Sequence, residues 1–115
     1  MTTGTAFDIR RIGGRIGAEI LGADLSGELD PAVFAEINAA LLEHKALVFR
    51  DQNLDDAAQL RFAALFGELT TAHPTVPAVE GQPNILPVDG EEGVRSNQWH
   101  TDVTFVRTPP KVTTL

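Results

Sequence analysis

The sequence contains no cysteine and no tyrosine, and only 6% of its residues are aromatic. The absence of cysteine excludes disulfide bonds and thiolate metal sites, so a metal would be held by nitrogen and oxygen donors. Iron, manganese and zinc fit such donors. Basic residues are also few, because 9 Lys and Arg stand against 16 Asp and Glu and give a formal charge of −7. Nucleic acids and anionic membranes bind clustered basic faces, so we expect neither partner.

Long apolar runs are absent as well. No stretch reaches the length of a membrane span, and residues 1–5 lack the basic region and apolar core of a signal peptide. We therefore expect a cytoplasmic protein. The 115 residues, of which 43% are hydrophobic, are typical of one small folded domain.

The N-terminal third predicts strands followed by a helix. Residues 7–11 and 15–20 read as two short strands around the turn signal Gly13-Gly14. Asp30 is a suitable N-cap, and Pro31 fits the first helical position, where a missing N–H costs nothing. Apolar residues then recur at helical spacing and predict one buried face, namely Val33, Phe34, Ile37, Leu41 and Leu42.

Further along the chain, residues 46–50 form a compact apolar run that predicts a buried strand. Asp55 or Asp56 can cap a second helix, which we expect Gly67 to end in a left-handed conformation. Residues 84–88 are a candidate strand inside a stretch rich in Pro and Gly.

A metal-ligand pair stands near the end of the sequence, in the run Trp-His-Thr-Asp-Val-Thr-Phe at residues 99–105. In a strand, His100 and Asp102 would project from the same face because side chains alternate. One imidazole and one carboxylate supply two of the three ligands of the facial triad that binds non-haem Fe(II). A His-x-Asp triplet alone is a weak motif, so its context decides.

This context resembles the taurine and alkylsulfate branch of the Fe(II)- and 2-oxoglutarate-dependent dioxygenases. The matching segments agree in order and spacing: residues 15–20, 22–26, 41–45, 48–52, 66–68, His73-Pro74, 99–105 and 108–110. The resemblance implies an α+β, β-rich fold: a double-stranded β-helix, the jelly roll also seen in cupins, with N-terminal helices outside it. It also implies that Arg50, Asp51 and Gln52 form a hydrogen-bonded support after the buried strand.

Site residues follow from the same resemblance. It implies that His100 and Asp102 are metal ligands, that His73 donates to a substrate sulfonate, and that Val103 and Phe105 line the pocket for the substrate carbons. Relatives carry the distal metal His and the Arg that binds 2-oxoglutarate far downstream. We therefore expect residues 1–115 to be the N-terminal part of a single dioxygenase domain, with these cofactor-binding residues beyond them.

The resemblance implies a reaction that uses Fe(II), 2-oxoglutarate and O2. The carbon next to a sulfate ester or sulfonate would be hydroxylated, and the product would break down to an aldehyde plus sulfate or sulfite, with succinate and CO2 as coproducts. Residues 29–45 and 54–57 look more like the alkylsulfatase members, and Ser96 stands where taurine-type enzymes carry an amide, while Asn97 lies one residue later. An alkyl sulfate or sulfonate is thus favoured over taurine or an aryloxyalkanoate.

A different class of function remains open. The chain could be a non-catalytic truncated module in which the His-x-Asp pair is a relic. Strand edges left by a partial core would then need cover from another chain. In either case we expect a homo-oligomer.

Overall fold

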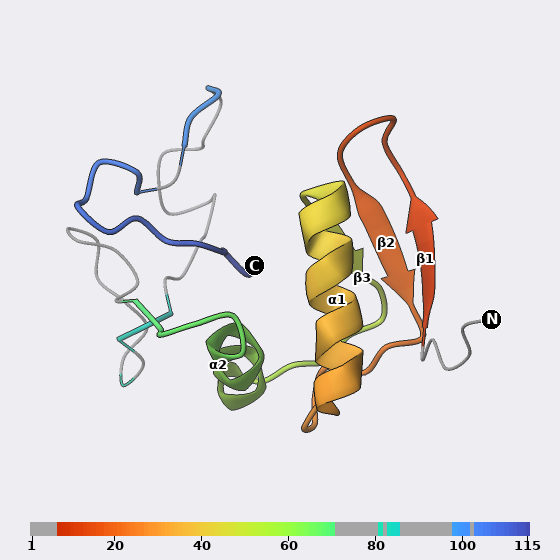
Figure 1. Cartoon of the computed structure of the whole chain (residues 1–115). Coiled ribbons are helices and arrows are strands. Elements are labelled where there is room, and N and C mark those ends of the chain that lie inside the picture. Colours follow the sequence, from red (N-terminus) through yellow and green to blue (C-terminus); the bar gives the residue numbers. More distant parts are fainter. Residues whose placement is uncertain (1–6, 71–80, 82, 86–97, 102) are drawn as a thin grey trace. The chain divides into compact units, whose positions relative to one another are not determined.

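The computed structural model describes residues 7–70, 81, 83–85, 98–101 and 103–115 (Figure 1). The chain divides into two compact units, Met1–Gln59 and Leu60–Leu115. The first unit holds a small sheet and a covering helix, and the second begins within a shorter helix. Within the described residues, no helix is both long enough and apolar enough to cross a membrane.

The sheet of the first unit has three short strands, β1 (Asp8–Arg11), β2 (Ala18–Leu21) and β3 (Leu47–Phe49), in the order β1-β2-β3. β1 and β2 pair antiparallel, with Ile9 opposite Ile20. β2 and β3 pair in parallel. A parallel pair needs a crossover connection, which is supplied by the helix between the two strands.

The loop between β1 and β2 is longer than the predicted turn, because Arg15 lies in the loop and β2 begins later. Gly17 has φ 106°, which lies outside the strand region, and its N–H donates to the carbonyl of His44 at 2.9 Å. At Gly13 an added Cβ would lie 2.1 Å from the carbonyl oxygen of Ile16. Only glycine allows the two backbone segments to approach this closely.

Helix α1 (Pro31–His44) begins as its sequence predicts. The carboxylate of Asp30 accepts from the N–H of Ala32 at 2.9 Å, so the predicted N-cap is confirmed. At the other end, Lys45 adopts φ 71° and its N–H donates to the carbonyl of Leu41 at 2.8 Å. This left-handed cap satisfies one of the last carbonyls of the helix.

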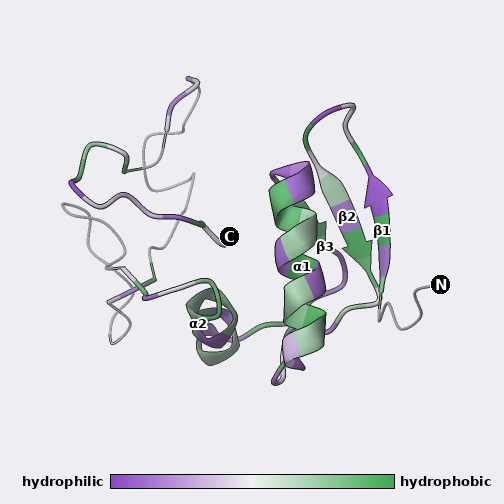
Figure 2. Ribbon diagram, viewed as in Figure 1, coloured by the Kyte–Doolittle hydropathy of each residue, from purple (hydrophilic) through white to green (hydrophobic). Residues whose placement is uncertain are grey.

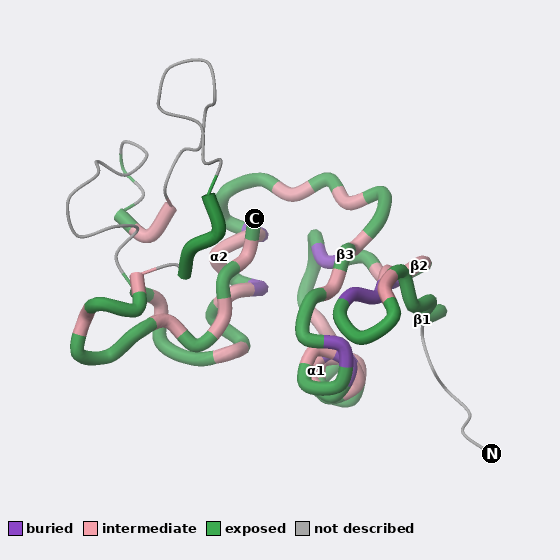
Figure 3. Tube along the Cα trace, turned by 90° about the horizontal axis from the view of Figure 1, so that it is seen from above, coloured by how far each residue is buried: buried purple, intermediate pink, exposed green. Residues whose placement is uncertain are grey.

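The core of the first unit lies between α1 and one face of the sheet (Figures 1 and 3). Its buried apolar residues are Phe7, Ala18, Ile20, Leu25, Ile37 and Ala40, and the apolar stretches of β2 and α1 are visible in Figure 2. Burying an isoleucine side chain contributes roughly 1.5–3 kcal/mol. The predicted apolar face is confirmed at Ile37 and wrong at Leu42, which is 64% exposed. His44 is buried in the last turn instead.

The strand predicted at residues 46–50 is present but shorter, and it is not fully buried. β3 has half-buried ends, and Val48 between them is 38% exposed. No further strand is described beside β3, so only β2 contributes backbone partners to it in the part of the chain that the structure covers.

Helix α2 (Asp56–Ala64) confirms the second predicted helix, and Asp55 is its cap, because its carboxylate accepts from the N–H of Ala58 at 2.8 Å. The helix ends at Ala64, before the predicted Gly67. Turns with i to i+3 hydrogen bonds follow it, and Gly67 has φ 154°, far from the left-handed helical region. The rings of Phe62 and Phe66 meet edge to face with centroids 5.4 Å apart.

The predicted strands of the second half are wrong where the structure describes them. The described residues 98–101 and 103–115 contain no strand, so the strand geometry considered for the His-x-Asp pair is absent from them. Asn84 lies in a turn and Ile85 outside any strand, while 86–88 lie outside the described residues. A strand needs a hydrogen-bonded neighbour, and the described part of the chain offers none to these segments. The mixed sheet and two helices are consistent with part of a jelly-roll protein, without showing the jelly roll.

Candidate metal centre

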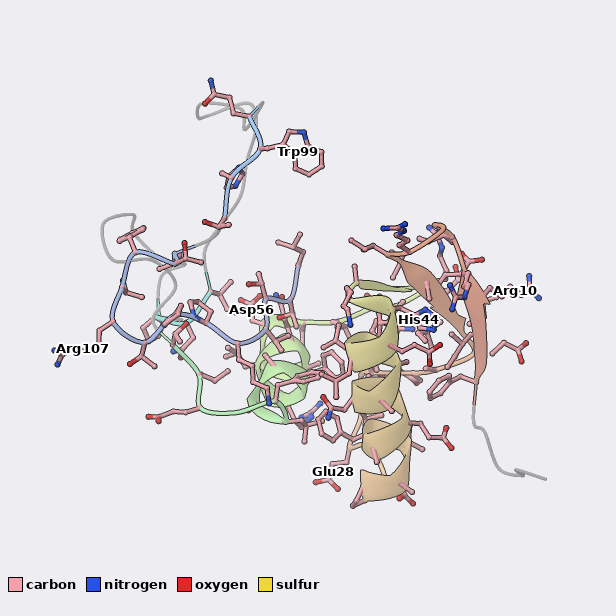
Figure 4. All side chains as sticks on the ribbon, turned by 45° about the horizontal axis from the view of Figure 1, so that its top comes forward. Arg10, Glu28, His44, Asp56, Trp99 and Arg107 are labelled. Atoms are coloured by element: carbon pink, nitrogen blue, oxygen red, sulfur yellow. The ribbon has the colours of Figure 1, made fainter. Side chains whose placement is uncertain are left out.

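The predicted metal-ligand segment is exposed in the structure. Trp99 is 104% exposed and projects from the ribbon in Figure 4, and His100 and Thr101 are exposed as well. Asp102 lies outside the described residues, as does His73. Among the residues that the structure describes, no group of three or more His, Cys, Asp or Glu could hold a metal ion. The assignment of the ligands thus stays a prediction.

The ring of His100 nevertheless has a defined orientation. Its Nδ1 lies 2.8 Å from the carbonyl oxygen of Gln98. A carbonyl oxygen can only accept, so Nδ1 must carry the hydrogen, and the lone pair of the neutral ring is on Nε2. Ligating histidines commonly hold one ring N–H against a backbone carbonyl in this way and bind the metal through the other nitrogen. The donor chemistry of this residue therefore fits a metal.

The residues after His100 form a turn. The hydroxyls of Thr101 and Thr104 are 2.7 Å apart, and Val103 has φ 53°. A β-branched residue is rarely left-handed, and such outliers cost of order 1–3 kcal/mol. Because the segment is a turn, strand alternation does not decide where Val103 and Phe105 point. Phe105 is 74% exposed, and the role of both residues in a substrate pocket stays a prediction.

The support predicted after β3 is confirmed for two of its residues. The side-chain oxygen of Gln52 accepts from the N–H of Leu25 at 2.8 Å, and its amide donates to the carbonyls of Ala23 and Arg50. Arg50 in turn pairs with Glu19 on β2, with Nε 2.9 Å from the carboxylate. These bonds fix the chain after β2 against the chain after β3, where the two parallel strands end.

Sequence reasoning missed an open cleft at this same end of the sheet. It has a volume of about 420 Å³ and is lined by Gly22, Ala23, Asp24, Ser26, Arg50, Asp51 and Asn53. The carboxylate of Asp24 accepts from the hydroxyl and the N–H of Ser26 at 2.6 and 2.9 Å, and these bonds lower its pKa, the hydroxyl most. The Asp-x-Ser spacing was a usable signal for this turn.

The scaffold and the motif segment together match one family of proteins. The model of the family described as "Taurine catabolism dioxygenase TauD, TfdA family" matches residues 8–115. The chain belongs to this family. The resemblance inferred from the motifs is thereby confirmed, and the match includes both the first unit and the segment with His100 and Asp102.

Two characterised TauD/TfdA relatives are similar over nearly all of the chain. The alpha-ketoglutarate-dependent sulfate ester dioxygenase of Pseudomonas putida is 52% identical over 95% of this chain and 36% of that protein. The alkylsulfatase of Acinetobacter baylyi is 52% identical over 95% of this chain and 34% of its own length. The chain thus spans about a third of these relatives.

A solved structure supports the family fold. A taurine dioxygenase from Burkholderia xenovorans superimposes with a TM-score of 0.63 at 40% identity, over 68% of this chain and 28% of that one. The sheet and helices described above are therefore a portion of a TauD-type architecture, in agreement with their mixed topology.

Proposed function

We propose that this TauD/TfdA member is an Fe(II)- and 2-oxoglutarate-dependent dioxygenase that acts on an alkyl sulfate ester or sulfonate. The observation that carries the proposal is the 52% identity to a sulfate ester dioxygenase and to an alkylsulfatase over 95% of the chain. Residues 1–115 are the N-terminal part of a single jelly-roll domain in this proposal. The enzyme is cytoplasmic and homo-oligomeric.

In this proposal His100 and Asp102 bind the metal, and the distal His and the Arg for 2-oxoglutarate come from the rest of the domain. The hydrogen bond from Nδ1 of His100 to Gln98 supports this assignment, because ligating histidines commonly hold one ring N–H against a backbone carbonyl. When bound, the ferrous ion supplies the oxygen chemistry, with 2-oxoglutarate converted to succinate and CO2.

The remaining proposed residues recognise the substrate. His73 donates a hydrogen bond to the sulfur oxyanion, since a buried anion without a partner is costly. Val103 and Phe105 pack against the substrate carbons and exclude water. Together they hold the carbon next to the sulfur oxyanion in a reactive position. Hydroxylation there yields an unstable product that releases sulfate or sulfite and an aldehyde.

A substrate panel on the full-length protein tests the proposal. The panel holds a medium-chain alkyl sulfate, an alkyl sulfonate, taurine and an aryloxyacetate, each with Fe(II), 2-oxoglutarate and O2. We expect succinate to form with the alkyl sulfate or sulfonate in equal amount to sulfate or sulfite. Turnover of taurine alone or of the aryloxyacetate alone would overturn the substrate assignment. No turnover of any substrate would favour the non-catalytic alternative.

A further inference from the structure

The metal-ligand segment, residues 98–105, carries a contact that the proposed function does not use. The hydroxyl oxygens of Thr101 and Thr104 lie 2.7 Å apart, which is the length of a hydrogen bond between two hydroxyls. The two threonines stand three residues apart, on either side of Asp102 and Val103 in the sequence. The bond therefore closes a short loop of the chain that includes a predicted metal ligand.

The backbone inside this loop holds an unfavourable conformation. Val103 has φ 53°, in the left-handed region that a β-branched residue rarely adopts. Such a conformation persists only where its surroundings enforce it, and outliers of this kind are concentrated at binding and catalytic sites. The bond between the two hydroxyls spans Val103, so it is a contact that enforces the turn. The strain and the bond together indicate that the shape of this turn serves a site.

The bond depends only on residues that are close in the sequence. Thr101 and Thr104 belong to the same turn, so the rest of the domain can cover the contact but is not needed to form it. Threonine side chains are also restricted at χ1, so the pair loses little rotamer freedom when it bonds. Because the effective dielectric constant inside a protein is low, exclusion of water strengthens such a bond. We therefore expect the contact in the complete domain.

A hydrogen bond on the other side already orients one predicted ligand. Nδ1 of His100 donates to the carbonyl of Gln98 at 2.8 Å, and the threonine pair begins at the residue after His100. Removal of outer contacts that orient metal ligands typically lowers the affinity for the metal by roughly 10–100-fold. The threonine pair occupies the place in the chain where such a contact acts.

We propose that Thr101 and Thr104 are positioning residues for the metal, and that their hydroxyl bond fixes the turn that follows His100. Neither threonine binds the metal. The inference rests on the proposed function, because it takes His100 and Asp102 as the ligands. Loss of the bond keeps both ligands but lets the turn adopt other shapes. The affinity for the metal then falls while the fold is unchanged.

Paired substitutions in the full-length protein test this role. Thr101→Val and Thr104→Val each remove a hydroxyl and keep the shape of the side chain. Calorimetric titration of the metal-free protein with Fe(II) under nitrogen measures the affinity, and we expect each variant to bind about tenfold more weakly. The double variant should bind no more weakly than either single variant, because both substitutions remove the same bond.

Two further variants separate positioning from a general loss of structure. Thr104→Ser keeps the hydroxyl and should restore most of the affinity. Thr113→Val removes an exposed hydroxyl outside the turn and should leave the affinity unchanged. Thermal unfolding of the metal-free variants should match that of the wild type. If Thr104→Val fails to fold, Thr101→Val and Thr101→Ser provide the same comparison.

The outcomes distinguish this role from the proposed function. A wild type that binds no Fe(II), or a His100→Ala variant that binds it with full affinity, overturns the ligand assignment and the positioning role together. If His100→Ala loses the metal while both valine variants keep full affinity, only the positioning role is overturned. Additive losses in the double variant or an equal loss in Thr104→Ser also overturn it, as does a lower unfolding temperature of the metal-free valine variants.

Discussion

Residues 7–59 and residues 98–115 differ in how closely local sequence and structure agree. The first region has capped helices, a paired sheet and a buried core. The second carries the most specific motif of the chain, yet its described residues contain no strand, and Trp99 and Phe105 are exposed. The difference shows that a short ligand motif can identify a family. The shape of the site around that motif depends on residues that are distant in the sequence.

The largest expected effect belongs to the motif segment. In the full-length protein, His100→Ala and Asp102→Ala should each lower turnover by more than about a hundredfold, because even the outer partners of metal ligands cost 10–100-fold. Thermal unfolding should change little. Succinate formation measures turnover, and elemental analysis measures the bound metal. Glu28→Ala, which removes an exposed carboxylate of the first unit, is the control variant and should change neither value. Full activity with bound metal in either ligand variant would contradict the assignment.

Substitutions in the core of the first unit should have the opposite effect and lower the stability of the fold. Ile37 is fully buried, so Ile37→Ala should lower the free energy of unfolding by about 2–5 kcal/mol through lost burial and a residual cavity. The control Leu42→Ala removes a side chain that is 64% exposed and should cost less than about 0.5 kcal/mol. Denaturant titration measures both values. Equal effects of the two substitutions would show that α1 packs on another face.

The hydrogen bonds of Gln52 after β3 should contribute less to the free energy of unfolding than the core does, but the contribution should be measurable. Gln52→Ala leaves the N–H of Leu25 and the carbonyl of Ala23 without their partner, which we expect to cost about 1–3 kcal/mol. Asn53→Ala is the neighbouring control. Hydrogen exchange should accelerate at Leu25 in the first variant only. Unchanged protection there would mean that the loop is held by other contacts.

The N-cap of α1 gives a smaller effect. Asp30→Ala should cost about 1 kcal/mol, because the N–H of Ala32 loses its acceptor, and Asp30→Ser should restore most of that loss. The comparison of the two variants in denaturant separates capping from general charge effects. If serine failed to rescue, the carboxylate would be acting through charge and not as a cap.

The smallest effect concerns pH. The bonds from Ser26 lower the pKa of Asp24 below 3.8, so the folded state favours the carboxylate. This contribution to stability is present above about pH 4 and is lost as the pH falls through the lower pKa of the folded state. Ser26→Ala removes the hydroxyl and should raise that pKa, which carboxyl NMR titration measures. An unchanged titration would show that the hydroxyl bond does not form in solution.

Much of the first region could be predicted from the sequence, because its signals are local. Asp30, Pro31 and Asp55 mark helix starts through chemistry within one turn. The strand bounds were less accurate, since β2 begins only after Gly17, which has a positive φ and donates its N–H to His44 far along the chain. The cleft at the ends of β2 and β3 could not be predicted, because it forms where segments about 30 residues apart meet through Gln52.

The sequence by itself determined the family, the N-cap of α1 and the identity of the candidate ligands His100 and Asp102. These depend on residue type and short spacing, which folding does not alter. Only the tertiary structure decided which apolar residues are buried and where the cleft beyond the ends of β2 and β3 forms. Burial and hydrogen bonding depend on which groups meet in space, and spacing along the chain does not specify that.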